Sequence, residues 1–366
     1  MNELKELLYE QDLWSKLSSS TKPLFLYGMG DGADKILDVC LNKNIKVSGV
    51  FASDEFVRGQ SFRGFTVKTY AQVKQAFPEI TILVSFATRL ENVLNKIYAL
   101  SNTDELYAPD VPVFGTGLFD SKYFADNFAK LDKVYSLLSD ETSKKAYYNI
   151  LKYKISGDIR FLAECETSPA EAYNTIICPK DDSVYADIGA YNGDTIREYS
   201  LYAGKNITAY AFEPDARNFK KLCENVSSLG ISQFKPFNIA AWNRQEQLIF
   251  YSRSGRNSAH TTAHKGLKQT VVEADRADRF IDKSVDYINI DAEGSDLEAL
   301  DGLHETISHS KPVVSCAVYH KNEDMFSIPL YLYDKYSDIY SDFGMYIRHF
   351  PYIPGWDTNV YIKNKQ

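Results

Sequence analysis

Acidic and histidine side chains follow apolar segments in the C-terminal half of the chain. The segments SVYADI, TAYAF, VDYINI and PVVSCAVY carry, at or beside their ends, Asp187, Glu213, Asp291 with Glu293, and His320. Segments of this length, rich in β-branched and aromatic residues, predict buried strands. Because ligands of parallel sheets bind beyond the carboxyl ends of the strands, we expect these side chains to meet in one site. Carboxylates and an imidazole there could bind a cation or move protons.

The turn after the first of these strands, DIGAYNGDT, has two glycines between two acids. Glycine lets the backbone approach a ligand closely because it carries no side chain. A second strand, Ile207 to Phe212, ends at Glu213, which lies 26 residues after Asp187. At about this offset an acid can accept hydrogen bonds from both hydroxyls of a ribose. The stretch therefore predicts a βαβ unit that binds a nucleoside.

The charge of this turn distinguishes between nucleoside ligands. The turn departs from G-x-G-x-x-G, and Asp187 and Asp194 flank it, so a pyrophosphate would be repelled. A positively charged nucleoside would be attracted. S-adenosylmethionine fits, because it has a sulfonium, an ammonium and a ribose. The alternative is an ordinary turn whose acids cap the following helix.

The bulk composition limits the class of protein. A chain of 366 residues favours two or three domains, and 44% hydrophobic with 25% charged residues is ordinary for a globular protein. The net charge of −8 and the scattered Lys and Arg residues argue against a nucleic-acid partner. The five cysteines form no C-x-x-C pair, so neither a zinc site nor a disulfide framework is indicated. Without a signal-peptide core or an apolar run of about 20 residues, we expect a cytoplasmic protein with no membrane span.

Residues 1–115 predict a small Rossmann-like domain. An amphipathic helix is expected over residues 1–17. Strand, glycine turn GMGDGA, helix and strand follow between Pro23 and Phe51, with further strands at Thr81 to Phe86 and Val111 to Phe114. The segments FLYGMGDGADKIL and KVSGVFASDE resemble the N-terminal modules of sugar-modifying enzymes, including the PglD-type sugar acyltransferases. In such modules the turn binds a nucleotide sugar or is purely structural, and both readings stay open.

The remaining chain predicts a helical connector and a second α/β domain. Helical spacing runs over Leu118 to Leu138 and Ser143 to Ile155, so residues 116–175 are expected to connect two Rossmann-like domains. In residues 176–366 the elements expected after the opening βαβ unit are a helix at 216–229, strands at 234–241, 247–251, 269–274 and 285–290, a helix at 292–304, and strands at 312–319, 345–350 and 359–362.

Six ordered motifs in this half carry a resemblance. DIGAYNGDT, FEPD, NIAAW, INIDAEGSDLEALDG, VYHKNEDMFSIPLYL and YIRHFPYIPGWDTNVYI resemble the FkbM family of S-adenosylmethionine-dependent methyltransferases. The resemblance covers about residues 176–366 and implies a class I methyltransferase sheet with a terminal antiparallel hairpin. It implies cofactor contacts at Asp187, Gly189, Ala190, Tyr191, Gly193, Asp194, Thr195, Glu213, Pro214, Asp215, Ala240 and Ala241. Where many members have Glu, this chain has Asp296, a change expected to affect helix packing more than chemistry.

His320 is the expected general base, oriented by Asp291 or Asp324. The alternative is that His320 binds substrate hydroxyls without moving a proton. Substrate contacts are expected from Arg253, Asn257, His260, Glu293 and Asp324. His260 and His264 have a metal-like spacing but no HExxH pattern, so no metal is expected, although Asp291 with His320 could bind a divalent ion.

The favoured function is O-methylation of a sugar, glycan or related natural product, as in surface-glycan or natural-product assembly. One alternative is a nucleotide-dependent oxidoreductase that holds NAD at the GMGDGA turn. Another is a non-catalytic nucleotide-sugar-binding module. The expected partner is a small-molecule or glycan acceptor, and the sequence leaves a homodimer open.

Overall fold

The computed structural model describes residues 3–112, 114–115, 117–252, 258–259 and 268–365. The chain forms two compact units. The first comprises Met1–Ser136, Glu141–Thr167 and His349–Asp357, and the second comprises Leu137–Asp140, Ser168–Arg348 and Thr358–Gln366. Residues 116–175, expected as a connector, are thus divided between the units.

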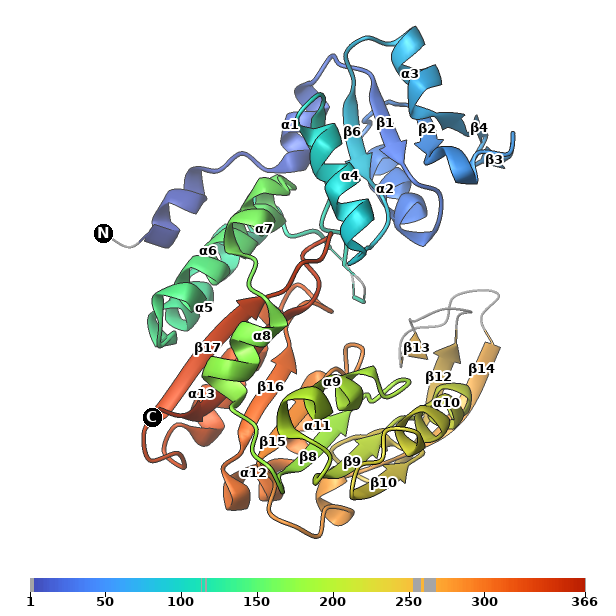
Figure 1. Ribbon diagram of the computed structural model, residues 1–366. Helices are drawn as coiled ribbons and strands as arrows, with labels where there is room; N and C mark the ends of the chain where they lie inside the picture. The colour runs from blue at the N-terminus through green and yellow to red at the C-terminus, as the bar shows by residue number, and fades with distance from the viewer. Residues whose placement is uncertain (1–2, 113, 116, 253–257, 260–267, 366) are drawn as a thin grey trace. The chain divides into compact units, whose positions relative to one another are not determined.

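The first unit contains a five-stranded sheet in the order β5-β2-β1-β6-β7, with parallel pairing throughout (Figure 1). Its strands are β1 (Leu24–Tyr27), β2 (Val47–Ala52), β5 (Lys68–Thr69), β6 (Thr81–Val84) and β7 (Glu105–Tyr107). Its helices include α2 (Asp31–Asn42), α3 (Tyr70–Ala76) and α4 (Glu91–Ser101), and a two-stranded ribbon of β3 (Ser61–Phe62) and β4 (Phe65–Thr66) completes this part. Every residue of β1 and β6 is buried, as expected for central strands of a parallel sheet.

Two expectations for this unit need correction. The single N-terminal helix is instead a 3-10 helix, η1 (Glu3–Tyr9), and an α-helix, α1 (Leu13–Ser19). The break occurs because Asp12 caps α1, its carboxylate accepting from Ser15 N at 3.0 Å. The described residues between Val111 and Phe114 form no strand, because β7 takes the place beside β6.

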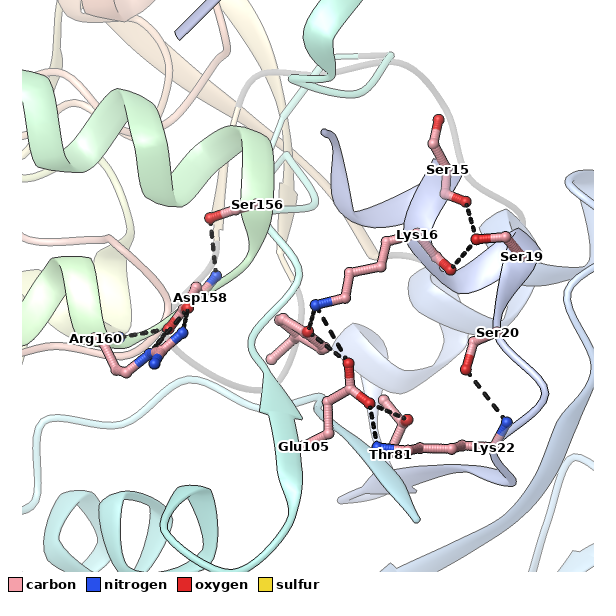
Figure 2. A network of polar contacts seen from close by, with 11 residues as sticks. Ser15, Lys16, Ser19, Ser20, Lys22, Thr81, Glu105, Ser156, Asp158 and Arg160 are labelled. Atoms are coloured by element: carbon pink, nitrogen blue, oxygen red, sulfur yellow. Dashed lines mark hydrogen bonds and ion pairs between the residues drawn. The ribbon is translucent and has the colours of Figure 1, made fainter. Parts of the chain in front are cut away.

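Glu105, at the start of β7, contacts two lysine side chains and a tyrosine hydroxyl (Figure 2). Its carboxylate accepts from Lys22 Nζ at 3.1 Å and from Tyr107 Oη at 2.8 Å, and Lys16 Nζ lies 3.3 Å away. Burial would raise the pKa of Glu105, but these hydrogen bonds outweigh burial and lower it to about 2. The network attaches α1 to the edge of this sheet.

The helices that follow complete the first unit. They are α5 (Ser121–Leu137), which ends at the unit boundary, α6 (Glu141–Ser156) and α7 (Arg160–Cys165). Within α6, Tyr147, Leu151 and Tyr153 are fully buried, so its aromatic stripe is core, as helical spacing predicted.

The second unit is built on a seven-stranded sheet in the order β10-β9-β8-β15-β16-β18-β17 (Figure 1). The strands are β8 (Val184–Ile188), β9 (Thr208–Phe212), β10 (Gln233–Phe237), β15 (Tyr287–Ile290), β16 (Val313–Ala317), β17 (Phe343–His349) and β18 (Thr358–Asn364). Pairing is parallel from β10 to β16, and β18 runs antiparallel to β16. This confirms the predicted α/β class and the sheet with an antiparallel terminal pair.

Helices precede the first strand of the second unit and separate several of its later strands. They are α8 (Pro169–Ala172), the π-helical turn η3 (Tyr173–Ile177), α9 (Asp194–Ala203), α10 (Ala216–Ser227), α11 (Asp296–Asp301), α12 (His304–Ser310) and α13 (Asp324–Tyr336). The expected helix at 292–304 is instead α11 and α12. Helix α11 begins four residues later than expected, because the Asp296 side chain closes the turn that precedes it. The Asp296 carboxylate accepts from Ala292 N at 2.8 Å and from Gly294 N at 3.2 Å.

A small second sheet in this unit has the order β11-β14-β12-β13. It consists of β11 (Ala240–Ala241), β14 (Lys268–Asp275), β12 (Glu246–Ser252) and β13 (Ser258–Ala259). The expected strand at 234–241 is therefore split between two sheets, with its break at Asn238 and Ile239. Across the described residues, no helix has the length and apolar character needed to cross a membrane.

Substitution of Gly302 tests the close packing of the end of α11 against the backbone at Trp242. A Cβ atom at this position would lie 1.8 Å from the carbonyl oxygen of Trp242. We expect Gly302→Ala to lower the free energy of unfolding by at least about 2 kcal/mol, measured by urea denaturation, because backbone atoms must move. Gly230→Ala is the control, since nothing lies within 4 Å there and only the positive φ of 70° adds a cost of about 1 kcal/mol. Equal losses in the two variants would contradict this account.

Candidate active site

The turns after β8 and β15 are in direct contact. Gly189 has φ +82°, and a Cβ atom there would lie 2.0 Å from the carbonyl oxygen of Asp291. Tyr191 and Glu293, in the same two turns, adopt left-handed backbone conformations with φ of 45° and 49°. Such strain in residues other than glycine is concentrated at functional sites. The expected meeting of the ends of these two strands is therefore present in the structure.

Asp187 is completely buried at the end of β8. Thr195 Oγ1, in the first turn of α9, donates to one of its carboxylate oxygens, and Asn289 Nδ2 on β15 donates to the other at 3.1 Å. Burial outweighs these hydrogen bonds and raises the pKa of Asp187 to about 6. Asp187 thus holds α9 and β15 against the turn that it begins.

Glu213, at the end of β9, reaches across to the first turn. Its Oε2 accepts from Tyr191 N at 2.9 Å, and its Oε1 accepts from Asp215 N at 2.8 Å. Burial, with smaller effects from the charges of Asp215 and Asp187, raises the pKa of Glu213 to about 8. Each carboxylate oxygen can accept a second hydrogen bond, so the group keeps capacity for two hydroxyl donors.

The other expected cofactor contacts lie around these two acids. Gly189, Ala190, Tyr191 and Gly193 form the turn between β8 and α9, Asp194 and Thr195 begin α9, Pro214 follows Glu213, and Ala240 and Ala241 form β11. Asp215 caps α10, accepting from Arg217 N at 2.9 Å and Asn218 N at 3.0 Å. The capping alternative concerned Asp187 and Asp194, and for α9 the N-cap is Gly193, with no side-chain cap hydrogen bond.

Asn238, which begins the segment up to Trp242 that the FkbM resemblance places beside the adenine, makes hydrogen bonds that the sequence did not predict. Its Nδ2 donates to the carbonyl oxygens of Glu213 at 2.8 Å and Pro214 at 3.1 Å. This fixes the chain beside Glu213 and places the segment leading to β11 next to it. The available signal was an asparagine immediately after an apolar strand, a position that often carries function.

His320 lies between two carboxylates. Its Nδ1 is 2.9 Å from Asp296 Oδ2, and its Nε2 is 3.0 Å from Asp291 Oδ1. The side chains of His320 and Asp296 are 1% and 2% exposed, whereas that of Asp291 is 43% exposed. Asp291 Oδ2 also accepts from the hydroxyl of Tyr319 at 3.1 Å. The arrangement is therefore a buried acid–imidazole pair beside a carboxylate whose Oδ1 is buried and whose side chain is partly exposed.

The electrostatics of this triad favour a charged imidazole. Burial would lower the pKa of His320, but the two carboxylates raise it well above its usual value. Desolvation would raise the pKa of Asp291, and the contacts with His320 and Tyr319 lower it. We conclude that near pH 7 His320 is an imidazolium and Asp291 is ionised.

The partner on the inner side of His320 differs from the expectation. Asp296, expected to affect packing, contacts the ring, whereas Asp324 Oδ2 accepts from Lys321 N at 2.7 Å. Asp324 is 3% exposed, and burial raises its pKa to about 7. The sequence carries no local signal for this contact, because Asp296 and His320 lie 24 residues apart and the helix was expected to begin four residues earlier.

Two more residues near the triad have ligand-binding capacity. Half-buried Glu293 has a pKa of about 8, raised first by burial and then by the charges of Asp291, Asp296 and Glu213. Asn322, which lies between His320 and Asp324 in sequence, is 4% exposed, and its Nδ2 has no hydrogen-bond partner among the described residues. A ligand acceptor atom would satisfy that amide. Arg253, Asn257 and His260 lie outside the described residues.

Donor atoms of Asp291, Asp296 and His320 lie within 4.8 Å of one another, which raises the question of a metal ion. The two carboxylates, however, face opposite nitrogens of the same ring. A metal needs ligand atoms about 2.0–2.6 Å away, so one ion could bind all three residues only after the ring left one carboxylate. The geometry favours an ion-paired triad in which His320 Nδ1 also makes a hydrogen bond to Asp296.

Four acids at this edge of the sheet have raised pKa values. They are Asp187, Glu213, Glu293 and Asp324, with values of about 6, 8, 8 and 7. Among the described residues, no lysine or arginine forms an ion pair with any of them. A ligand that carries positive charge and hydroxyl donors would offset the cost of ionising them. The residues therefore fit a cationic nucleoside.

Comparison with known proteins agrees with this geometry. Residues 187–345 match the sequence model of the methyltransferase FkbM domain. The crystal structure of methyltransferase FkbM from Methylobacillus flagellatus KT is 15% identical, covers 98% of this chain and 92% of its own, and superposes with a TM-score of 0.68. A methyltransferase from Streptococcus mutans in complex with SAH is 14% identical over 54% of this chain and 99% of its own, with a TM-score of only 0.35. No curated protein matches the chain. The chain thus carries an FkbM methyltransferase domain at residues 187–345, in a protein with the fold of a solved FkbM methyltransferase.

Proposed function

We propose that this protein transfers a methyl group from S-adenosylmethionine to a hydroxyl of a sugar-containing small molecule or glycan. The observation that carries the choice of donor is the set of four acids with raised pKa values that form no ion pair with a lysine or arginine among the described residues. When bound, S-adenosylmethionine supplies an activated methyl group on a sulfonium. The choice of acceptor rests on the resemblance to the FkbM family and on Glu293 and Asp324, whose carboxyl groups could bind sugar hydroxyls.

The residues that hold the donor follow from the two turns. Glu213 accepts hydrogen bonds from ribose hydroxyls with the lone pairs that Tyr191 N and Asp215 N leave unused. The backbone at Gly189 and Gly193 permits close approach, and the segment from Asn238 to Ala241 flanks the base. Positioning of this kind supplies much of the rate of a methyl transfer.

The acceptor hydroxyl must lose a proton, and the triad supplies a base. His320 is poorly suited to accept it, because both ring nitrogens face carboxylates and the ring is already charged. Asp291 is ionised and partly exposed. We therefore assign the base role to Asp291, with His320 and Asp296 as positioning residues that hold its carboxylate and balance its charge. General base catalysis of this kind contributes roughly 10²–10⁴-fold.

The oxidoreductase alternative has less support from the first unit. Asp31, which lies inside the GMGDGA motif, and Asp34, which follows it, occupy the first turn of α2, where a pyrophosphate would need positive charge. Gly32 is accounted for by packing, since a Cβ atom there would lie 2.5 Å from the carbonyl oxygen of Ser85.

The proposal predicts labelled product from methyl-labelled S-adenosylmethionine and a panel of nucleotide sugars and glycans. We expect label on an acceptor oxygen, located by mass spectrometry, and a rise in melting temperature with S-adenosylhomocysteine but not with NAD. A reaction without acceptor is the control for donor breakdown. Stabilisation by NAD alone, with no calorimetric heat from S-adenosylhomocysteine, would overturn the proposal.

Variants of the triad separate the two possible bases. Asp291→Asn should lower kcat by about 10²–10⁴-fold at saturating donor, with unchanged affinity for S-adenosylhomocysteine, because the proton acceptor is lost. The control is Asp301→Asn on α11, a surface acid that accepts from Tyr331 Oη at 3.0 Å. If His320 were the base, kcat would rise with pH as the imidazolium loses its proton, and Asp291→Asn would retain more than a tenth of kcat.

A further inference from the structure

We propose that the second unit contains another ligand site, for a small organic phosphate, at the opposite edge of its sheet. A cavity of about 300 Å³ lies where β8, β15 and β16 begin, lined in part by Lys180, Asp286 and Pro312. The acids of the methyl-transfer site follow the other ends of the same strands. A strand of five residues spans about 17 Å, so the two sites cannot share a ligand of this size.

Positive charge dominates the walls of the cavity. Among the described residues, four lysines line it, namely Lys180, Lys311, Lys363 and Lys365, against the single acid Asp286. The carboxylate of Asp286 is already engaged, because Oδ2 accepts from Val184 N at 2.8 Å. Such an excess of lysine is unexpected in a chain with a net charge of −8. A ligand with two negative charges would be attracted to it.

Lys180, Lys311 and Lys365 are exposed, whereas Lys363 is buried. It stands near the end of β18 and is 7% exposed. Its Nζ donates to the carbonyl oxygen of Thr175 at 3.3 Å, and it forms no ion pair with any described residue. Lys365 is different, because its Nζ lies 3.7 Å from Asp342 Oδ1. Burying an ammonium without a counter-ion is costly, and an anion in the cavity would offset that cost.

The remaining walls indicate the class of anion. Pro179 and Pro312 line the cavity together with the tyrosines Tyr199 and Tyr287, whose rings are stacked with centroids 5.5 Å apart. Apolar and aromatic surface beside lysines favours a phosphate attached to a compact ring or short apolar body. A lysine ammonium binds phosphate as a point charge. The volume is at the lower end for small-molecule sites, which argues against a polymer.

The experiment uses phenyl phosphate and the intact chain, with binding followed by calorimetry. We expect saturable binding with a Kd below about 1 mM at low salt, weaker at high salt, and none for phenol. Lys363→Met, which keeps the side-chain length and removes the charge, should weaken binding at least tenfold. Lys221→Met, which changes an exposed lysine of α10, is the matched control. If Lys363→Met fails to fold by circular dichroism, the double variant Lys180→Met, Lys311→Met serves the same purpose.

Further arms distinguish the sources of the phosphate and the location of the site. Vesicles that contain phosphatidic acid, compared with phosphatidylcholine alone, test for a lipid headgroup. Binding to those vesicles that is lost in Lys363→Met would assign the site to lipid, and binding of free phenyl phosphate alone would assign it to a soluble ligand. Because the site is independent of the methyl donor, S-adenosylhomocysteine should not displace phenyl phosphate. The proposal would be overturned if S-adenosylhomocysteine displaced phenyl phosphate, or if neither phenyl phosphate nor the phosphatidic acid vesicles bound. Equal weakening of binding by Lys221→Met and Lys363→Met would also overturn it.

Discussion

Carboxyl groups at the ends of parallel strands, removed from water, are the constraint on which the second unit depends. Burial raises the pKa values of Asp187 and Glu213 to about 6 and 8. A carboxyl group with a raised folded-state pKa stabilises the fold while it is protonated, and that stability is lost as pH rises from about 4 through the folded-state value. The free protein therefore carries an electrostatic cost near neutral pH. A cationic ligand with hydroxyl donors relieves the cost, so the burial that destabilises the free protein near neutral pH also favours binding of the ligand.

In the triad, by contrast, contacts between opposite charges outweigh burial and favour the charged forms of His320 and Asp291. Asp296 and Asp291 hold a charged imidazole between them, and the outer carboxylate keeps a partly exposed side chain. The inner acid is buried because it also closes the turn after β15 through Ala292 N and Gly294 N. One side chain thus determines both the backbone of the turn and the charge state of His320. Because Asp296 has both functions, it affects the chemistry of the site although it is shorter than the Glu that many FkbM family members have at this position.

The sequence predicted those features that depend on local pattern. Buried strands with acids at their ends, the glycine turn at Gly189 and the antiparallel strand at the sheet edge all follow from hydrophobic runs and turn chemistry. It did not predict that Asp296 faces His320, because a helical start was expected four residues earlier and the turn depends on long-range contacts. The expected strand at 234–241 was wrong for a similar reason, since Asn238 leaves the ladder to bind the chain at Glu213. Contacts between side chains far apart in sequence leave no periodic signal.

The most direct test of the account is the proton balance of donor binding. Calorimetric titration of S-adenosylhomocysteine at pH 7, in buffers of different ionisation enthalpy, measures how many protons leave the protein. Glu213, with a pKa of about 8 in the free protein, is mostly protonated at pH 7 and must ionise to accept both ribose hydroxyls. The account therefore predicts release of about one proton per site, affinity that rises between pH 6 and 8, and loss of both effects in Glu213→Gln. Binding without proton release, or with the same affinity across this range, would contradict it.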